Sequence, residues 1–280
     1  MNPPRAPLFD YRTAGAARSH AAAYDRFLDR AAAEAVADRL ATVTRRFAAG
    51  LLIGDSVPAE IAASAGDWTL ARFDRQEILA VGEARFDLAV SIYSLQAIND
   101  LLGALVQIRR ALKPDGLFLG ALFGGGTLKE LRDAFAHGEA ATLGGISPRV
   151  SPFADIRDGG GLLQRAGFAL PVADVERLTV YYKDFFALAR DLRGHGQTNN
   201  LAERSRRFLR RDTLAATLAH YAAHHGENGK LRASFETLYL TGWAPHDSQP
   251  QKLRRGTARS RLADALGTTE QTLTDFPKPG

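Results

Sequence analysis

Short apolar runs alternate with helical segments through the first half of this 280-residue chain. Leu51–Ile53, Phe86–Ile92 and Leu117–Phe123 each have the length and the branched or aromatic residues of a buried strand. Between the last two, Asp100–Ala111 repeats leucine and isoleucine at helical spacing. Strands that alternate with helices of this length predict an α/β fold with a mostly parallel sheet.

The remaining segments complete a single predicted domain. Its expected span is residues 1–265, with a helical insertion at about 184–230 and a flexible tail over 266–280. Thr127 and Glu130 have the spacing of a capping box that opens a helix. Further helices are expected at about 22–47, 58–65, 155–166, 184–192 and 201–225, and further strands at about 68–73, 172–182 and 235–243.

Composition excludes several classes of site. The chain has no cysteine, so disulfides, thiolate zinc sites, iron–sulfur clusters and cysteine nucleophiles are excluded. No apolar run reaches the roughly 18 residues that a membrane-spanning helix needs. Residues 1–20 lack the apolar core of a secretory signal, so a cytoplasmic location is expected.

The positive charge is concentrated toward one end. Residues 200–280 carry 13 basic and eight acidic residues, whereas residues 1–199 carry 23 of each. This basic last third of the chain could bind RNA, anionic lipid or an acidic protein surface. No aromatic-interleaved stripe accompanies it, so a solvated basic surface is the simpler interpretation and nucleic-acid binding the less favoured one.

Three stretches together carry a family resemblance: residues 86–132, 144–168 and 238–258. They resemble class I S-adenosylmethionine-dependent methyltransferase-fold proteins, and within them the branch of complex I assembly factors, which is also similar to the malonyl-carrier-protein methyltransferases of biotin synthesis. The resemblance runs from about Leu8 to about Ala265. It implies a seven-stranded α/β sheet, S-adenosylmethionine at the carboxyl ends of the strands, and hydroxylation of an arginine on an iron–sulfur subunit of respiratory complex I.

The chain departs from that family where the cofactor would bind. Of the family's glycine-rich loop only Gly54 is kept, while Val57 adds a branched side chain and Pro58 removes a backbone donor. Only 31 residues separate Gly54 from Phe86, too few for the usual strands and helices. We therefore expect a truncated sheet of fewer than seven strands.

The missing element can be assigned in two ways. If residues 68–73 match the family's third strand, Asp74 would lie near the adenine and the ribose-binding strand is lost. If they match the second strand, Asp74 would be the ribose ligand and the third strand is lost. A plain turn aspartate is an equally simple interpretation, because short polar residues favour turns.

The resemblance implies two groups of site residues and leaves the catalytic residue unassigned. The candidate cofactor-binding residues are Gly54, Asp55, Asp74, Ser94 and Gln96. The candidate substrate or partner residues are Phe123, Gly124, Arg149, Asn199, Trp243, His246 and Gln249. Structural roles compete at each position: Asp55 can cap a helix, the glycines can serve a sharp reversal, and Trp243 can belong to the core.

Three histidines, His220, His224 and His225, invite a metal interpretation, since His220 and His224 share a helix face. No acidic residue lies in the same helical turn, so no metal site is expected. The sequence thus indicates a methyltransferase-like protein that acts on, or binds, a respiratory-chain subunit. The alternatives are a catalytically inactive relative that serves as an assembly chaperone or structural partner, and an RNA-binding module.

Overall fold

The computed structural model describes residues 7–10, 26–151, 156–250 and 267–268. The chain divides into two compact units, residues 1–246 and 247–280. The domain boundary expected at residue 265 stays a prediction, because residues 251–266 lie outside the described part. Among the described helices, none is both long and apolar enough to cross a bilayer.

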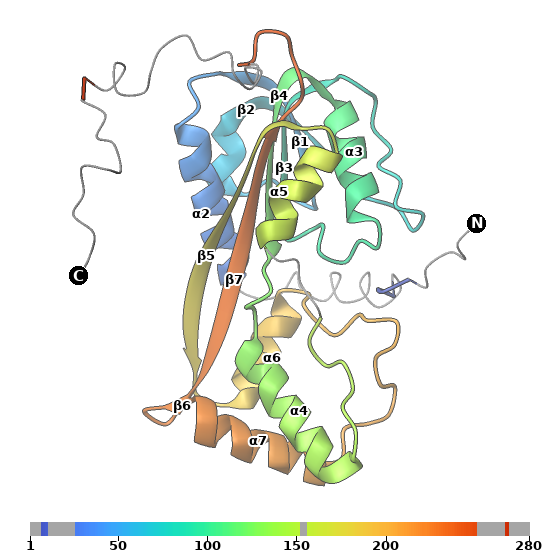
Figure 1. The fold of residues 1–280 in the computed structure, drawn as a ribbon, viewed down its shortest axis with the longest axis vertical. Coiled ribbons are helices and arrows are strands. Elements are labelled where there is room, and N and C mark those ends of the chain that lie inside the picture. Colours follow the sequence, from blue (N-terminus) through green and yellow to red (C-terminus); the bar gives the residue numbers. More distant parts are fainter. Residues whose placement is uncertain (1–6, 11–25, 152–155, 251–266, 269–280) are drawn as a thin grey trace, which may run out of the picture. The chain divides into compact units, whose positions relative to one another are not determined.

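The first unit is built on one sheet in the order β2-β1-β3-β4-β7-β5, with β6 paired to β7 (Figure 1). The first four strands of that order pair in parallel, whereas β7 pairs antiparallel with both β4 and β5. This confirms the predicted Rossmann-like α/β class with added helices. The strands are β1 (Phe47–Ile53), β2 (Ala65–Ala71), β3 (Phe86–Ile92), β4 (Leu112–Phe123), β5 (Ala169–Tyr182), β6 (Gly226–Glu227) and β7 (Lys230–Trp243).

The strand count corrects the expectation of fewer than seven strands. The sheet has seven, because the hairpin that precedes β7 adds the two-residue β6. The expectation for the short interval is confirmed: one strand, β2, lies between Gly54 and Phe86. β2 is an edge strand, and its Leu70 side chain is exposed.

Helices cover both faces of the sheet. Side chains alternate along a strand, so Leu51 and Ile53 join the core cluster under α3 (Leu101–Ala111) and α5 (Ile156–Arg165). Leu52 points to the other face and packs in the cluster that contains Val36 of α2 (Phe27–Ala41). The buried apolar residues of β1, β3 and β4 therefore hold the carboxyl ends of the parallel strands in fixed positions.

A separate helical layer lies beyond those strand ends. β5 and β7 are long and extend past the parallel strands, and α4, α6 and α7 pack around their far end (Figure 1). This layer has its own core cluster, which includes Phe135, Leu188, Tyr221 and Phe235. Its helices are α4 (Lys129–Leu143), α6 (Phe185–Gly194) and α7 (Arg211–His225).

Three local expectations were wrong. One is the helix expected over residues 201–225, of which only the part from Arg211 onward (α7) is helical. The helix predicted over residues 22–47 ends at Ala41 within the described part, and Phe47 begins β1 because its ring packs into the sheet core. The predicted capping box does not form: Leu128 is the N-cap of α4, with no side-chain cap bond. Glu130 accepts hydrogen bonds from Ser234 of β7 instead, so tertiary contact replaces the local cap.

Candidate functional site

The carboxyl ends of β1, β2 and β3 surround a cavity of about 300 Å³, here called the first cavity. Open α/β sheets bind their ligands at this edge. Four of the five predicted cofactor-binding residues line it: Gly54, Asp55, Ser94 and Gln96. They meet because each follows the end of β1 or β3, two strands that pair in parallel.

The loop after β1 differs from a phosphate- or carboxylate-binding cradle. It leads into η1 (Ala59–Ser64), a short 3-10 helix with Pro58 as its N-cap and no side-chain cap bond. Asp55 forms an ion pair with Arg72, which follows β2. A Cβ atom on Gly54 would lie 3.5 Å from the nearest Leu52 carbon, an ordinary contact. The protein's own packing therefore does not require glycine at position 54.

Asp74 serves a turn instead of the first cavity, which it does not line. Its Oδ1 accepts hydrogen bonds from the backbone N–H groups of Gln76 and Ile78, each at 2.8 Å. At the end of β2, the residues that do line the cavity are Arg72 and Phe73. The turn interpretation of Asp74 is thus the one that its contacts support.

Substituting Asp74 should affect stability more than ligand binding. Asp74→Ala leaves two backbone N–H groups without their acceptor, which should cost about 1–2 kcal/mol of unfolding free energy. Asp74→Asn keeps an acceptor oxygen and should lose much less. Urea unfolding of the two variants measures both values, and equal stability of Asp74→Ala and wild type would contradict the turn role.

A second cavity of about 230 Å³ opens between the strand ends and the helical layer. Three of the predicted partner residues line it: Phe123, Arg149 and Asn199. Leu131 and Phe135 of α4 and Leu188 of α6 add apolar walls. The structure thereby brings together residues that are up to 76 positions apart in the sequence.

Gln96 lines both cavities. Its Oε1 accepts a hydrogen bond from the backbone N–H of Phe123 at 3.4 Å. Its Nε2 is buried and has no hydrogen-bond partner within the described residues. A buried amide donor without a partner is costly, so Gln96 offers a donor to a group that enters either cavity.

Arg149 is held in the wall of the second cavity by Glu139 of α4. The Arg149 Nε atom donates to Glu139 Oε1 at 2.7 Å, and Glu139 also accepts from the backbone and side chain of Ser147. Burial raises the pKa of Glu139, but the hydrogen bonds from Ser147 and Arg149 outweigh it and hold that pKa below its ordinary value. Glu139 is therefore a charged, buried anchor for Arg149.

Two of the predicted partner residues, Asn199 and Gly124, form contacts that hold neighbouring segments of the fold together. Asn199 donates from its side chain to the Pro148 carbonyl at 2.8 Å, which ties the loop after α6 to the loop after α4. The Gly124 N–H donates to the Glu236 carbonyl at 2.8 Å, and a Cβ on Gly124 would come 2.5 Å from the Glu236 carboxylate. Glycine at 124 is thus explained by close packing against β7.

The last three predicted residues, Trp243, His246 and Gln249, are not among those that line either cavity. Trp243 pairs with Leu117 at the start of the parallel β3–β4 ladder, whereas the cavities lie at the opposite edge. His246 ends the first compact unit, and Gln249 belongs to the second. Neither lines a described cavity.

Sequence reasoning missed three residues in the wall of the first cavity. His195 is buried, and its Nδ1 lies 2.9 Å from Asp29 Oδ2, while its Nε2 has no hydrogen-bond partner within the described part of the chain. Tyr93 follows β3 with a left-handed φ of 49°, a conformation that is strained for a non-glycine residue. Burial raises the pKa of Tyr93 far above its ordinary value, and its hydroxyl bonds to Thr237 at 2.6 Å.

The lining of the first cavity differs in two places from the S-adenosylmethionine site that the family resemblance implies. The resemblance implies a carboxylate after β2 that meets the ribose hydroxyls, but Arg72 and Phe73 line the cavity at that point, and Arg72 pairs with Asp55. The acidic residues that line the cavity, Asp29, Asp55 and Glu60, lie on other segments. Asp74 accepts hydrogen bonds from backbone N–H groups of its own turn. Pro58 has no N–H to offer, and a six-residue 3-10 helix follows it.

Comparisons with known proteins agree with the fold. The model of the methyltransferase domain family matches residues 9–171. The arginine-hydroxylase NDUFAF5, mitochondrial, of Danio rerio is 43% identical over 190 residues, which cover 68% of this chain and 59% of that protein. The malonyl-[acyl-carrier protein] O-methyltransferase of Xylella fastidiosa is 41% identical over 167 residues, which cover 60% of this chain and 55% of that protein.

A solved structure, the YcgJ protein of Bacillus subtilis, is 12% identical, with a TM-score of 0.49 over 76% of this chain and 98% of that one. The matched part of the chain spans between half and two thirds of the length of both curated relatives.

Proposed function

The chain belongs to the methyltransferase domain family, and we propose that within it this protein works by binding a respiratory-chain protein subunit in the second cavity, as an assembly factor that does not transfer a methyl group. Relatives named arginine-hydroxylase support a protein as the partner. One observation carries the proposal: Phe123, Arg149 and Asn199 come together in the wall of the second cavity. In the first cavity, Arg72 and Phe73 line the end of β2, and the acidic lining residues Asp29, Asp55 and Glu60 lie on other segments.

The lining of the second cavity favours an apolar side chain with an acidic neighbour. Its walls are mostly apolar, and amides such as Gln96 and Asn200 add a few polar groups, a composition typical of binding pockets. Among the described lining residues the charged ones are Arg149 and Arg193, and none is acidic. Arg193 is exposed and can pair with a carboxylate of the partner.

A capture experiment tests the proposal. The full chain should recover a complex I subunit from an extract of its native organism. Ala189→Trp places an indole in the second cavity from α6 and should reduce recovery at least about tenfold. Gly54→Ala alters the first cavity, where a Cβ has room, and should leave recovery unchanged.

Two outcomes would reject this function. Equal recovery by Ala189→Trp and wild type, with both variants folded by circular dichroism, would exclude the second cavity as the binding site. Loss of recovery in Trp243→Ala instead would place the partner at the opposite edge of the sheet.

The second candidate function is a cofactor-dependent enzyme that modifies the bound subunit. It is favoured by the Asp29–His195 pair: both residues line the first cavity, as Tyr93 does, and the buried Nε2 of His195 has no hydrogen-bond partner among the described residues. Carboxylate-oriented histidines of this kind can hold or accept a proton. Cofactor affinity separates the two candidates, because binding of the partner alone needs no occupant in the first cavity.

A further inference from the structure

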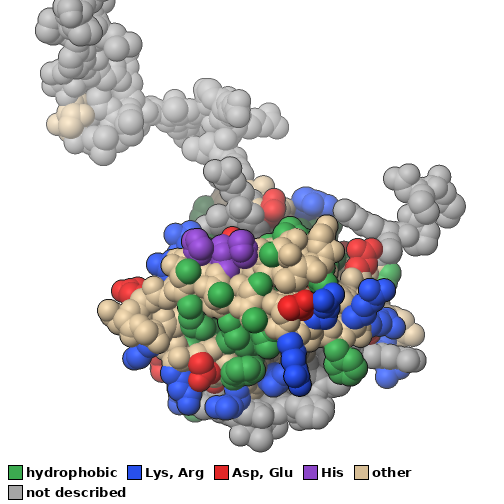
Figure 2. All heavy atoms as spheres, turned by 90° about the horizontal axis from the view of Figure 1, so that it is seen from below, with side chains coloured by type: hydrophobic (Ala, Val, Ile, Leu, Met, Phe, Trp, Pro, Cys, Tyr) green, Lys and Arg blue, Asp and Glu red, His purple; other side chains and the backbone are tan. Residues whose placement is uncertain are grey.

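A histidine-rich cluster lies on the helical layer, away from both cavities. His137, His220 and His224 stack in sequence, with ring centroids 4.1 Å and 4.0 Å apart. Histidine side chains form a visible patch on this face of the molecule (Figure 2). The sequence placed two of them on one helix but offered no acidic partner nearby. The structure supplies that partner from a different helix.

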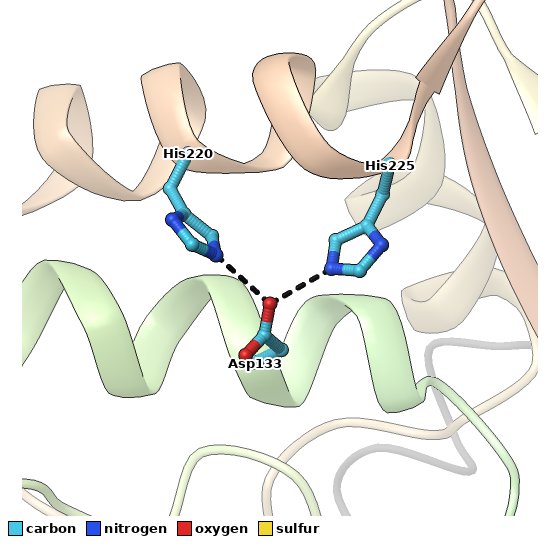
Figure 3. A group of neighbouring side chains, drawn as sticks. All are labelled: Asp133, His220 and His225. Atoms are coloured by element: carbon cyan, nitrogen blue, oxygen red, sulfur yellow. Dashed lines mark hydrogen bonds and ion pairs between the residues drawn. The ribbon is translucent and has the colours of Figure 1, made fainter.

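Asp133 of α4 points between His220 and His225 of α7 (Figure 3). Its Oδ2 lies 2.8 Å from the Nε2 atom of each histidine. The three ligand atoms all lie within 4.8 Å of one another. Three potential metal ligands thus converge on one point from two helices.

The two helices are held together independently of this cluster. Gly138 of α4 packs so closely on α7 that an added Cβ would lie 2.2 Å from Thr217 Oγ1. The hydroxyls of Thr142 and Thr213 also share a hydrogen bond of 2.7 Å. This packing fixes the separation of α4 and α7, so a metal ion would find its ligands already in place.

The donor set suits a borderline transition-metal ion. Two imidazole nitrogens and one carboxylate oxygen are ligands typical of Zn²⁺ and Co²⁺. Three protein ligands leave a fourth tetrahedral position for water. The histidine side chains are 12% and 19% exposed and that of Asp133 is 54% exposed, so an ion can reach the group from solvent.

We propose that Asp133, His220 and His225 form a Zn²⁺-binding site that joins α4 to α7. Such an ion would stabilise the helical layer, including the wall that Leu131 and Phe135 of α4 give to the second cavity. The competing interpretation is a carboxylate that accepts two imidazole hydrogen bonds and binds no metal. The two interpretations differ in what happens when the carboxylate becomes an amide.

Metal titration of the untagged full-length chain tests the site. In metal-free buffer, Zn²⁺ should bind with a stoichiometry of one and a Kd of about 1 μM or lower, measured by competition with a chromophoric chelator. At a hundredfold excess over Kd, the Tm should rise by about 5 °C. Co²⁺ should give the intense visible absorption of tetrahedral coordination. Absence of saturable Zn²⁺ binding below about 0.1 mM would overturn the proposal.

Three variants separate metal ligation from hydrogen bonding. Asp133→Asn keeps an acceptor oxygen for the two histidines but is a poorer ligand, and it should weaken Zn²⁺ at least about tenfold, as should His220→Ala. His224→Ala is the matched control, since His224 stacks on His220 without belonging to the group. Unchanged affinity in Asp133→Asn, or an equal loss in His224→Ala, would overturn the assignment of the three ligands.

Discussion

Replacing Glu139 with alanine is expected to lower the free energy of unfolding by about 3–5 kcal/mol. The side chain of Glu139 is only 1% exposed and forms an ion pair with Arg149 at 2.6 Å. It also accepts hydrogen bonds from the backbone N–H and hydroxyl of Ser147, at 2.5 Å and 2.7 Å. Removing the carboxylate leaves these donors and a half-buried guanidinium without their partner. Urea unfolding at pH 7 measures the loss.

The pH dependence of that loss distinguishes the charge of Glu139 from its size. The pKa of Glu139 is below its ordinary value of 4.5, because hydrogen bonds and Arg149 outweigh burial. A lowered pKa stabilises the folded state above the ordinary pKa, and this contribution is lost as the pH falls through the folded value. Compared with the size-matched Glu139→Gln, wild type should therefore be more stable at pH 7 and lose that advantage as the pH falls below the ordinary pKa of 4.5 and through the lower folded value. A difference independent of pH would contradict the role assigned to the charge.

Strands of the sheet could be predicted from the sequence where local pattern and tertiary packing agree. The predicted strand 86–92 matches β3. Six of its seven residues are buried, and a short, mostly apolar segment of this length is typical of a buried strand. Asp100 marks the start of α3 because its side chain accepts the Gly103 N–H, a purely local cap. Thr127 and Glu130 likewise have the local spacing of a capping box at the start of α4, but the Glu130 side chain accepts a hydrogen bond from Ser234 of β7. A contact between residues 104 positions apart cannot be read from local spacing.

The same limit applies to the candidate site. Gly54, Asp55, Ser94 and Gln96 could be placed together, because each follows a strand whose end lies at one edge of the sheet. The contact of His195 with Asp29 joins residues 166 positions apart, on a loop and a helix that have no shared motif. Asp133 and His220 are likewise 87 positions apart. Both pairs depend on how helices pack, which the hydrophobic pattern of each helix alone does not determine.

S-adenosylmethionine is expected to bind no tighter than about 1 mM, equivalent to about −4 kcal/mol. A micromolar site would need about 4 kcal/mol more, and the ribose-binding carboxylate expected directly after β2 is not among the described residues that line the first cavity. Arg72 occupies the wall where a ribose-binding carboxylate is expected, and Pro58 removes a donor from the loop after β1. Calorimetric titration of the full chain with S-adenosylmethionine and S-adenosylhomocysteine measures the affinity.

If S-adenosylmethionine does bind, variants show whether it binds in the first cavity. Asp55→Ala and Gln96→Ala alter residues that line the first cavity, whereas Asp74→Asn lies outside its lining and serves as the control. Micromolar binding that is weakened by the first two and kept by the control would contradict the expected loss of the cofactor site. It would also favour the modifying enzyme over the binding factor, because the Asp29–His195 pair would then lie in the wall of an occupied cavity. Weak binding in every variant, together with partner recovery that depends on the second cavity, is the result that the binding function requires.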